Sequence, residues 1–196
     1  MMKLRHSIIL SGLGVICGTT ILLTGCQQLS EKVEDPAAGL NGGFEIDQRG
    51  LPVNWIMYTP KTVKAADFDI IIDRETFKEG QQSLKFEVRR ATGQIGWHAP
   101  GFTNEFFDVG RFYGPAQYRL SFWIRNSGAE FIVAGGPVSL KGGDMRTLVR
   151  DNSSTDGWKQ YEYTIEVPEE QWLRMQLNII SPGSFWIDGI KIEKIN

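Results

Sequence analysis

Residues 118–125, YRLSFWIR, alternate apolar and polar side chains and constrain the fold more than any other stretch. Successive side chains of a β-strand point to opposite faces, so this period predicts a strand with two distinct faces. One face is apolar throughout and is expected to pack on a core. The opposite face is polar apart from one indole and consists of Arg119, Ser121, Trp123 and Arg125.

Similar segments recur from residue 40 onward, and none keeps a helical period for long. Clusters of glycine, proline, asparagine and aspartate separate them, as expected of turns between strands. This organisation predicts an all-β domain, a β-sandwich jelly roll of two antiparallel sheets. The predicted strands are 44–47, 54–58, 68–73, 83–89, 94–98, 105–108, 117–126, 130–138, 145–150, 159–167, 172–180 and 184–195.

The N-terminal sequence has the order of a bacterial export signal. Lys3 and Arg5 precede an apolar run over residues 8–23, which is short for a bilayer core of about 20 residues. The sequence LTGC, ending at Cys26, follows directly and resembles the lipobox of bacterial lipoproteins. In that family the processing enzymes lipidate the cysteine and cut before it. The alternative is an uncleaved N-terminal anchor with an incidental cysteine.

This resemblance divides the chain into a signal peptide (1–25), a lipidated Cys26 with a flexible tether (26–39) and a domain (40–196). Cleavage would remove Cys17, so no thiol would remain for a disulfide. The lipid would hold the domain on a membrane, outside the cytoplasm. Gln27 differs from the aspartate that resembles an inner-membrane retention signal, which favours the outer membrane or cell surface.

Charge and residue types exclude several functions. Without residues 1–25, the 21 basic side chains fall to 19 against 23 acidic ones, a net charge near −4 that argues against nucleic acid. His98 would be the last histidine, so Cys-His catalysis and zinc sites with several such ligands are not expected. No catalytic motif stands out, and we expect no enzyme. A carboxylate pair for glycoside cleavage remains formally open.

The strand predicted at 172–180 repeats the two-faced composition of the first one. Sugars present flat C–H patches that stack on aromatic planes and hydroxyls that bond planar polar groups. If both strands are close neighbours in one sheet, their polar faces form a platform with two indoles. The predicted carbohydrate-binding residues are Trp123, Trp172, Arg119, Arg125, Arg174, Gln176 and Asn178.

Two alternatives remain open for this surface. The arginines could be surface charges paired with Glu162 or Glu130. The binding site could also lie at the loop edge of the sandwich, where Trp97 and His98 would line a groove.

Several motifs in order resemble the jelly-roll carbohydrate-binding modules of the galactose-binding-like superfamily, the type that binds xylan or β-glucan. They are residues 41–45 (NGGFE), 83–86 (SLKF), 118–123 (YRLSFW) and 185–190 (FWIDGI). The resemblance spans residues 40–196, although each motif is loose on its own. It implies a glycan-binding lipoprotein without catalytic activity. The alternatives are a structural or protein-interaction lipoprotein and, less favoured, a jelly-roll glycan lyase or hydrolase.

The resemblance also implies a structural calcium ion, which many of these modules hold. The corresponding ligands are Glu45, the loop that begins at Asp73, and Asp188. One departure is Gly189, which stands where the family often has a second acid. The alternative is that Glu45 and Asp188 pair with Lys191 or with a backbone amide. The apolar phase also breaks at Asp188, which predicts a β-bulge.

Overall fold

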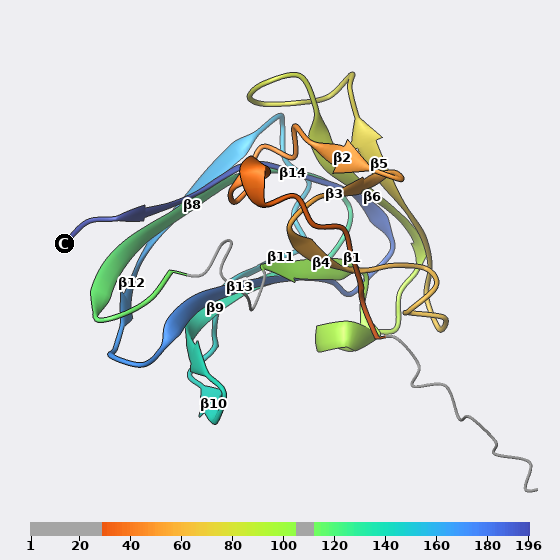
Figure 1. Cartoon of the computed structure of the whole chain (residues 1–196). Helices are drawn as coiled ribbons and strands as arrows, with labels where there is room; N and C mark the ends of the chain where they lie inside the picture. Colours follow the sequence, from red (N-terminus) through yellow and green to blue (C-terminus); the bar gives the residue numbers. More distant parts are fainter. Residues whose placement is uncertain (1–28, 105–111) are drawn as a thin grey trace, which may run out of the picture.

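A computed structural model describes residues 29–104 and 112–196 and places them in two antiparallel β-sheets that form a sandwich (Figure 1). The predicted all-β jelly-roll class is confirmed. The seven-stranded sheet has the order β1-β4-β7-β13-β9-β10, with β11 also paired to β9. Its strands are β1 (Glu31–Lys32), β4 (Trp55–Tyr58), β7 (Gly101–Asn104), β13 (Trp172–Ile179), β9 (Phe131–Ser139), β10 (Gly142–Gly143) and β11 (Arg146–Asp151).

The five-stranded sheet covers the other side of the core in the order β12-β8-β14-β6-β5. A short hairpin joins β2 (Asp47–Gln48) to β3 (Leu51–Pro52) outside both sheets. The five strands are β12 (Lys159–Val167), β8 (Ala116–Ser127), β14 (Gly183–Lys194), β6 (Ser83–Arg90) and β5 (Asp67–Asp73).

The core rests on the alternation seen in the sequence. On β8, Leu120, Phe122 and Ile124 are fully buried, whereas Arg119 and Arg125 on the opposite face are exposed. Burying a side chain of this size contributes about 1.5–3 kcal/mol. The bulge predicted in the last strand is confirmed, because the register of β14 against β8 shifts between Asp188 and Lys191.

The 94–98 stretch is a loop rather than the predicted strand. It contains the 3-10 helix η2 (Gly96–His98), and both Gly93 and Gly96 have a φ of +71°. This left-handed backbone suits glycine and interrupts a strand. The strand predicted at 105–108 lies outside the described residues, and β7 (Gly101–Asn104) precedes it in the chain.

The predicted flexible tether is in part a folded element. Glu31 and Lys32 pair with β4, and the 3-10 helix η1 (Pro36–Ala38) follows. Asn54 accepts a hydrogen bond from the backbone N–H of Asp35 at 2.9 Å and donates one to its carbonyl. These contacts fix residues 31–38, whereas the predicted signal peptide (1–25) and Cys26 lie outside the described residues. No helix within 29–104 or 112–196 is long and apolar enough to span a bilayer.

Candidate functional site

Trp123 and Trp172 do not form a common platform, so that prediction is wrong. Trp123 lies on β8 in the five-stranded sheet, and Trp172 lies on β13 in the seven-stranded sheet. Their polar faces are the two opposite outer faces of the sandwich. Trp172 is also only 5% exposed. The seven predicted binding residues therefore separate into Arg119, Trp123 and Arg125 on one face and Trp172, Arg174, Gln176 and Asn178 on the other.

The outer face of the five-stranded sheet pairs its aromatic rings with cations. Trp186 lies beside Lys85 and Arg125, with their charged groups 4.8 and 5.5 Å from the ring centroid. Its indole N–H donates to Asp73 at 2.8 Å. Trp123 is half-buried, with the Lys78 ammonium 4.2 Å from its ring centroid. Cation–π contacts of this kind stabilise the sheet surface and occupy the ring faces that a sugar would need.

Arg119 on the same face has carboxylate partners. Its guanidinium lies 3.6 Å from Glu162 and 3.8 Å from Glu193. This geometry matches the alternative in which the arginine is a surface charge. Exposed pairs of this length contribute little to stability.

The outer face of β13 holds its planar polar groups in fixed positions. Arg174 Nε donates to Thr103 Oγ1 at 3.0 Å, and Thr103 Oγ1 donates to the Met175 carbonyl at 2.7 Å. Burial raises the pKa of the Tyr58 hydroxyl, and the nearby Arg174 guanidinium partly opposes that rise. Arg174 and Gln176 remain half-buried rather than covered. A guanidinium held in this way can bond a ligand hydroxyl with little loss of side-chain entropy.

Asn178 holds a loop. Its Oδ1 accepts from Gly96 N and from Gln176 Nε2, both at 3.0 Å. Its Nδ2 donates to the Gly96 carbonyl at 2.9 Å. The side chain is buried under η2, so the structure places Asn178 as the residue that fixes this loop rather than at an open surface.

Tyr113 is an aromatic residue of this face that strand alternation did not single out. It forms an isolated antiparallel bridge with Trp172, so both side chains lie on the same side. The two rings meet edge to face with centroids 6.5 Å apart. Tyr113 is 47% exposed. It lies in an irregular segment, where no periodic pattern marks an exposed ring.

The loop-edge alternative corresponds to an open pocket. Trp97 is 50% exposed, and its ring centroid lies 5.8 Å from that of the exposed His98. Both residues line a pocket of about 490 Å³ together with the 62–65 turn, Thr92 and Gln94. This pocket lies at the end of the sandwich where β4 leads into that turn.

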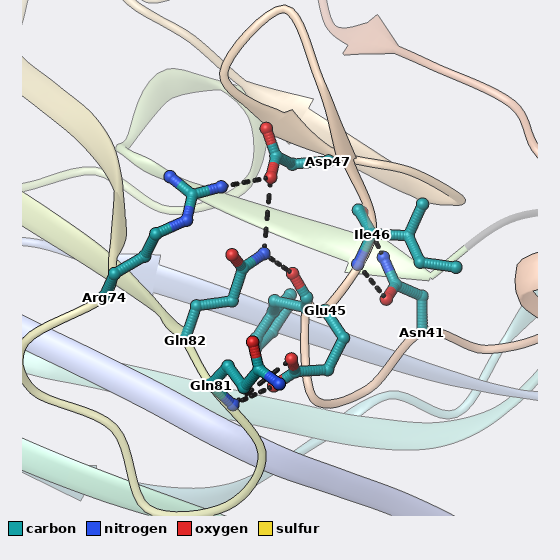
Figure 2. Close-up of polar contacts among 8 residues, drawn as sticks. Asn41, Glu45, Ile46, Asp47, Arg74, Gln81 and Gln82 are labelled. Carbon is teal, nitrogen blue, oxygen red and sulfur yellow. Dashed lines mark hydrogen bonds and ion pairs between the residues drawn. The ribbon is translucent and has the colours of Figure 1, made fainter.

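Glu45, Asp73 and Asp188, the acids predicted to bind calcium, each accept hydrogen bonds from backbone amides. Within residues 29–104 and 112–196, no group of three or more His, Cys, Asp or Glu side chains is placed to hold a metal ion. Glu45 accepts two hydrogen bonds from the backbone N–H of Gln81, at 3.0 and 3.2 Å (Figure 2). Asp73 instead accepts from the amides of Glu75 and Thr76.

Asp188 is fully buried, and backbone amides surround its carboxylate. Its Oδ2 accepts from the N–H groups of Lys78 and Glu79 at 2.7 and 2.9 Å, and its Oδ1 accepts from Gly189 N at 2.6 Å. Amide N–H groups carry partial positive charge and do not bind cations. This contact set favours the amide alternative, and calcium binding stays a prediction.

Burial raises the pKa of Asp188 above that of an ordinary aspartate. The three amide hydrogen bonds oppose that rise, and the nearby Glu45 carboxylate adds to it. The Lys191 ammonium lies 2.8 Å from the Glu79 carboxylate and forms an ion pair with it.

No protein-family model matches this chain, and no curated protein is significantly similar to it. Solved structures do resemble it. A xylan-binding family 22 carbohydrate-binding module from Paenibacillus barcinonensis Xyn10C has a TM-score of 0.54 at 14% identity, covering 79% of this chain and 92% of the module.

Two further structures have the same fold. The C-terminal family 22 module of Clostridium thermocellum Xyn10B has a TM-score of 0.51 at 15% identity, covering 78% of this chain and 91% of that one. The enzymatically active domain of bacteriophage CBA120 tailspike protein 4 has a TM-score of 0.53 at 14% identity, covering 82% of this chain but 22% of that one. At such identities the likeness shows the fold alone, a β-sandwich jelly roll of two antiparallel sheets.

Proposed function

We propose that this chain is a glycan-binding lipoprotein, anchored outside the cytoplasm by lipid on Cys26, which binds a polysaccharide without transforming it. The glycan site is the outer face of the seven-stranded sheet around Tyr113, Arg174 and Gln176. Support comes from the shared fold with modules that bind xylan and from the LTGC sequence. Fold alone does not imply function, so the residues of the site are the main support for the proposal.

One observation supports this location of the glycan site. An exposed ring and two half-buried planar hydrogen-bonding groups share one outer face of β13. Tyr113 lies opposite Trp172. Along β13, Arg174 follows Trp172 by two residues and Gln176 follows it by four, which are distances of about 7 and 13 Å. The ring would stack on a sugar face while the guanidinium and amide bond its hydroxyls.

The chemistry of these three groups favours binding over cleavage. Glycoside hydrolysis requires two carboxyl groups at a defined separation, whereas the groups that residues 29–104 and 112–196 contribute to the proposed site are a phenol, a guanidinium and an amide. The rival role as a protein-interaction lipoprotein would use the same exposed face. Binding of a defined oligosaccharide distinguishes the two roles.

Titration of the purified mature protein with xylan, β-glucan and peptidoglycan oligosaccharides tests the proposal. A stacked ring contributes about 1 kcal/mol, so Tyr113→Ala should weaken binding about fivefold. A charged hydrogen bond contributes about 1.5–3 kcal/mol, so Arg174→Ala should weaken binding roughly tenfold or more. Trp123→Ala, on the opposite sheet, is the matched control and should bind as the parent does. Loss of binding in Trp123→Ala alone would move the site to the five-stranded sheet, and no ligand in any panel would reject glycan binding.

A further inference from the structure

The first described residues of the chain lie close to the predicted lipid. Cys26 precedes Leu29 by three residues, so the two Cα atoms are at most about 11 Å apart. Leu29 is followed almost at once by β1, which is hydrogen-bonded to β4. A domain joined so directly to a lipidated cysteine cannot move far from the bilayer, and one end of it must face the membrane.

The strand register identifies that end. Glu31 lies opposite Met57, so the antiparallel pairing carries Leu29 toward Thr59. The Lys61 ammonium bonds the Glu31 carboxylate at 3.1 Å and connects β1 to the turn after β4. The next residues of that turn, 62–65, line the pocket that contains Trp97 and His98. Figure 1 shows the start of β1 running down toward η2 at the same end of the sandwich.

Apolar side chains are displayed at this end. Ile95 is 60% exposed, Trp97 is half-exposed, and Leu29 is exposed as well. The loop that carries the first two is fastened, because Asn178 bonds both backbone groups of Gly96 and Thr92 Oγ1 donates to the His98 carbonyl at 2.7 Å. These side chains are thus held out toward solvent instead of folding onto the core.

The groups around the apolar tip are compatible with a lipid headgroup region. Lys64 lines the pocket next to Trp97, and a lysine ammonium near a bilayer surface is attracted to anionic lipids. The carboxylates that follow the turn, Asp67 and Asp69, are each bonded to Arg89 at 2.7 Å. An indole is also a preferred side chain at the boundary between headgroups and hydrocarbon.

We infer that this end, formed by Leu29, the 59–66 turn and the 93–98 loop, docks on the membrane surface and inserts Ile95 and Trp97 between lipid headgroups. The inference rests on the proposed lipidation of Cys26. The pocket beside Trp97 also has the chemistry of a small glycan site, but the position of Cys26 brings the bilayer, rather than a distant polymer, against it.

Site-specific labelling tests the docking. The mature protein would contain no free thiol, because Cys17 is removed and the Cys26 sulfur carries the lipid, so Ile95→Cys can be labelled alone with an environment-sensitive dye. Leu140→Cys is the matched control. Leu140 is 93% exposed and follows the last residue of β9. Ile132, near the start of β9, lies opposite Asn178, so Leu140 is about 25 Å along the strand from the loop that Asn178 holds.

Both lipidated variants are reconstituted on vesicles of phosphatidylethanolamine and phosphatidylglycerol. Docking predicts that the label at position 95 shifts its emission to the blue and is quenched by lipids with spin-labelled chains, while the label at position 140 stays aqueous. Flotation of the same samples reports the anchor separately. Vesicle-bound protein with an aqueous label at position 95 would overturn the docking but leave the anchor intact.

Two other outcomes would also overturn the inference. Failure to float would remove both the anchor and the docking that depends on it. A label at position 95 that responds to a soluble oligosaccharide but not to vesicles would make this end a glycan site instead.

Discussion

Asp188 is the residue whose removal should destabilise this fold most clearly. The Asp188→Ala change leaves three backbone N–H groups, from Lys78, Glu79 and Gly189, without their acceptor. A hydrogen bond to a charged group contributes about 1.5–3 kcal/mol net, and the burial that raises the pKa of Asp188 subtracts from the sum. We expect a loss of about 3–5 kcal/mol in the free energy of unfolding for alanine. Asparagine keeps one acceptor oxygen and should lose roughly 1–3 kcal/mol.

Urea unfolding monitored by tryptophan fluorescence measures these differences, with the parent protein run in EDTA and in excess calcium as control. If amides alone satisfy Asp188, the parent unfolds at the same urea concentration in both. A loss below about 1 kcal/mol for Asp188→Ala would refute the reasoning. An EDTA effect as large as the substitution would show instead that a calcium ion is the partner, since a ligand bound only by the folded state must stabilise it.

The pH dependence of stability distinguishes backbone amides from a calcium ion as the partner of Asp188, because the two predict changes of opposite sign. The pKa of Asp188 is raised in the folded state, so its protonation stabilises the fold below the unfolded pKa of about 3.9, and that stabilisation is lost as pH rises through the folded pKa. The advantage of the parent over Asp188→Asn should therefore grow as pH falls from 7 toward 4. A bound cation would lower this pKa and make the advantage shrink over the same interval.

Three further predictions follow from named contacts. Gly80→Ala should lower the free energy of unfolding by roughly 1–3 kcal/mol, since φ is +66° there and a Cβ would lie 2.0 Å from Glu45 Oε1. Gly93→Ala is the control in the same urea assay, because its φ is also positive (+71°) but the space around it is open, so only the smaller backbone cost is expected. Asn178→Ala should accelerate hydrogen exchange at the Gly96 amide by more than tenfold, whereas unchanged exchange would mean that the side chain does not hold the loop. Trp186→Phe should lose about 1 kcal/mol through the missing bond to Asp73, and a stability equal to the parent would count against that bond.

The sequence predicted single strands well because their period is local. The alternation of residues 118–125 and of 172–180 correctly assigns side chains to the core face or the outer face of β8 and β13, although Ser121, Trp172 and Asn178 on the outer faces are buried as well. Which strands become neighbours depends on pairings between distant parts of the chain. β13 lies between β7 and β9, and β8 lies between β12 and β14, and no periodicity distinguishes these arrangements from one in which β8 and β13 are adjacent.

The errors near the site have a similar cause. The 94–98 stretch has strand-forming residues, but Gly93 and Gly96 adopt left-handed backbone and turn it into a loop held by a distant residue, Asn178. Tyr113 is exposed because an isolated bridge sets it beside Trp172, a long-range contact outside any regular strand. The predicted planar groups Arg174 and Gln176 do lie on an outer face, since alternation alone decides that.

β13 connects the two proposed surfaces. Arg174 and Gln176 belong to the glycan face, and Gln176 donates to Asn178, whose amide fixes the loop at the membrane end. Four residues of strand separate Arg174 from Asn178, a distance of about 13 Å. A glycan held on this face would therefore lie within a few nanometres of the bilayer. If Cys26 carries the proposed lipid, this arrangement suits a polymer close to the membrane, because only four residues separate Cys26 from β1.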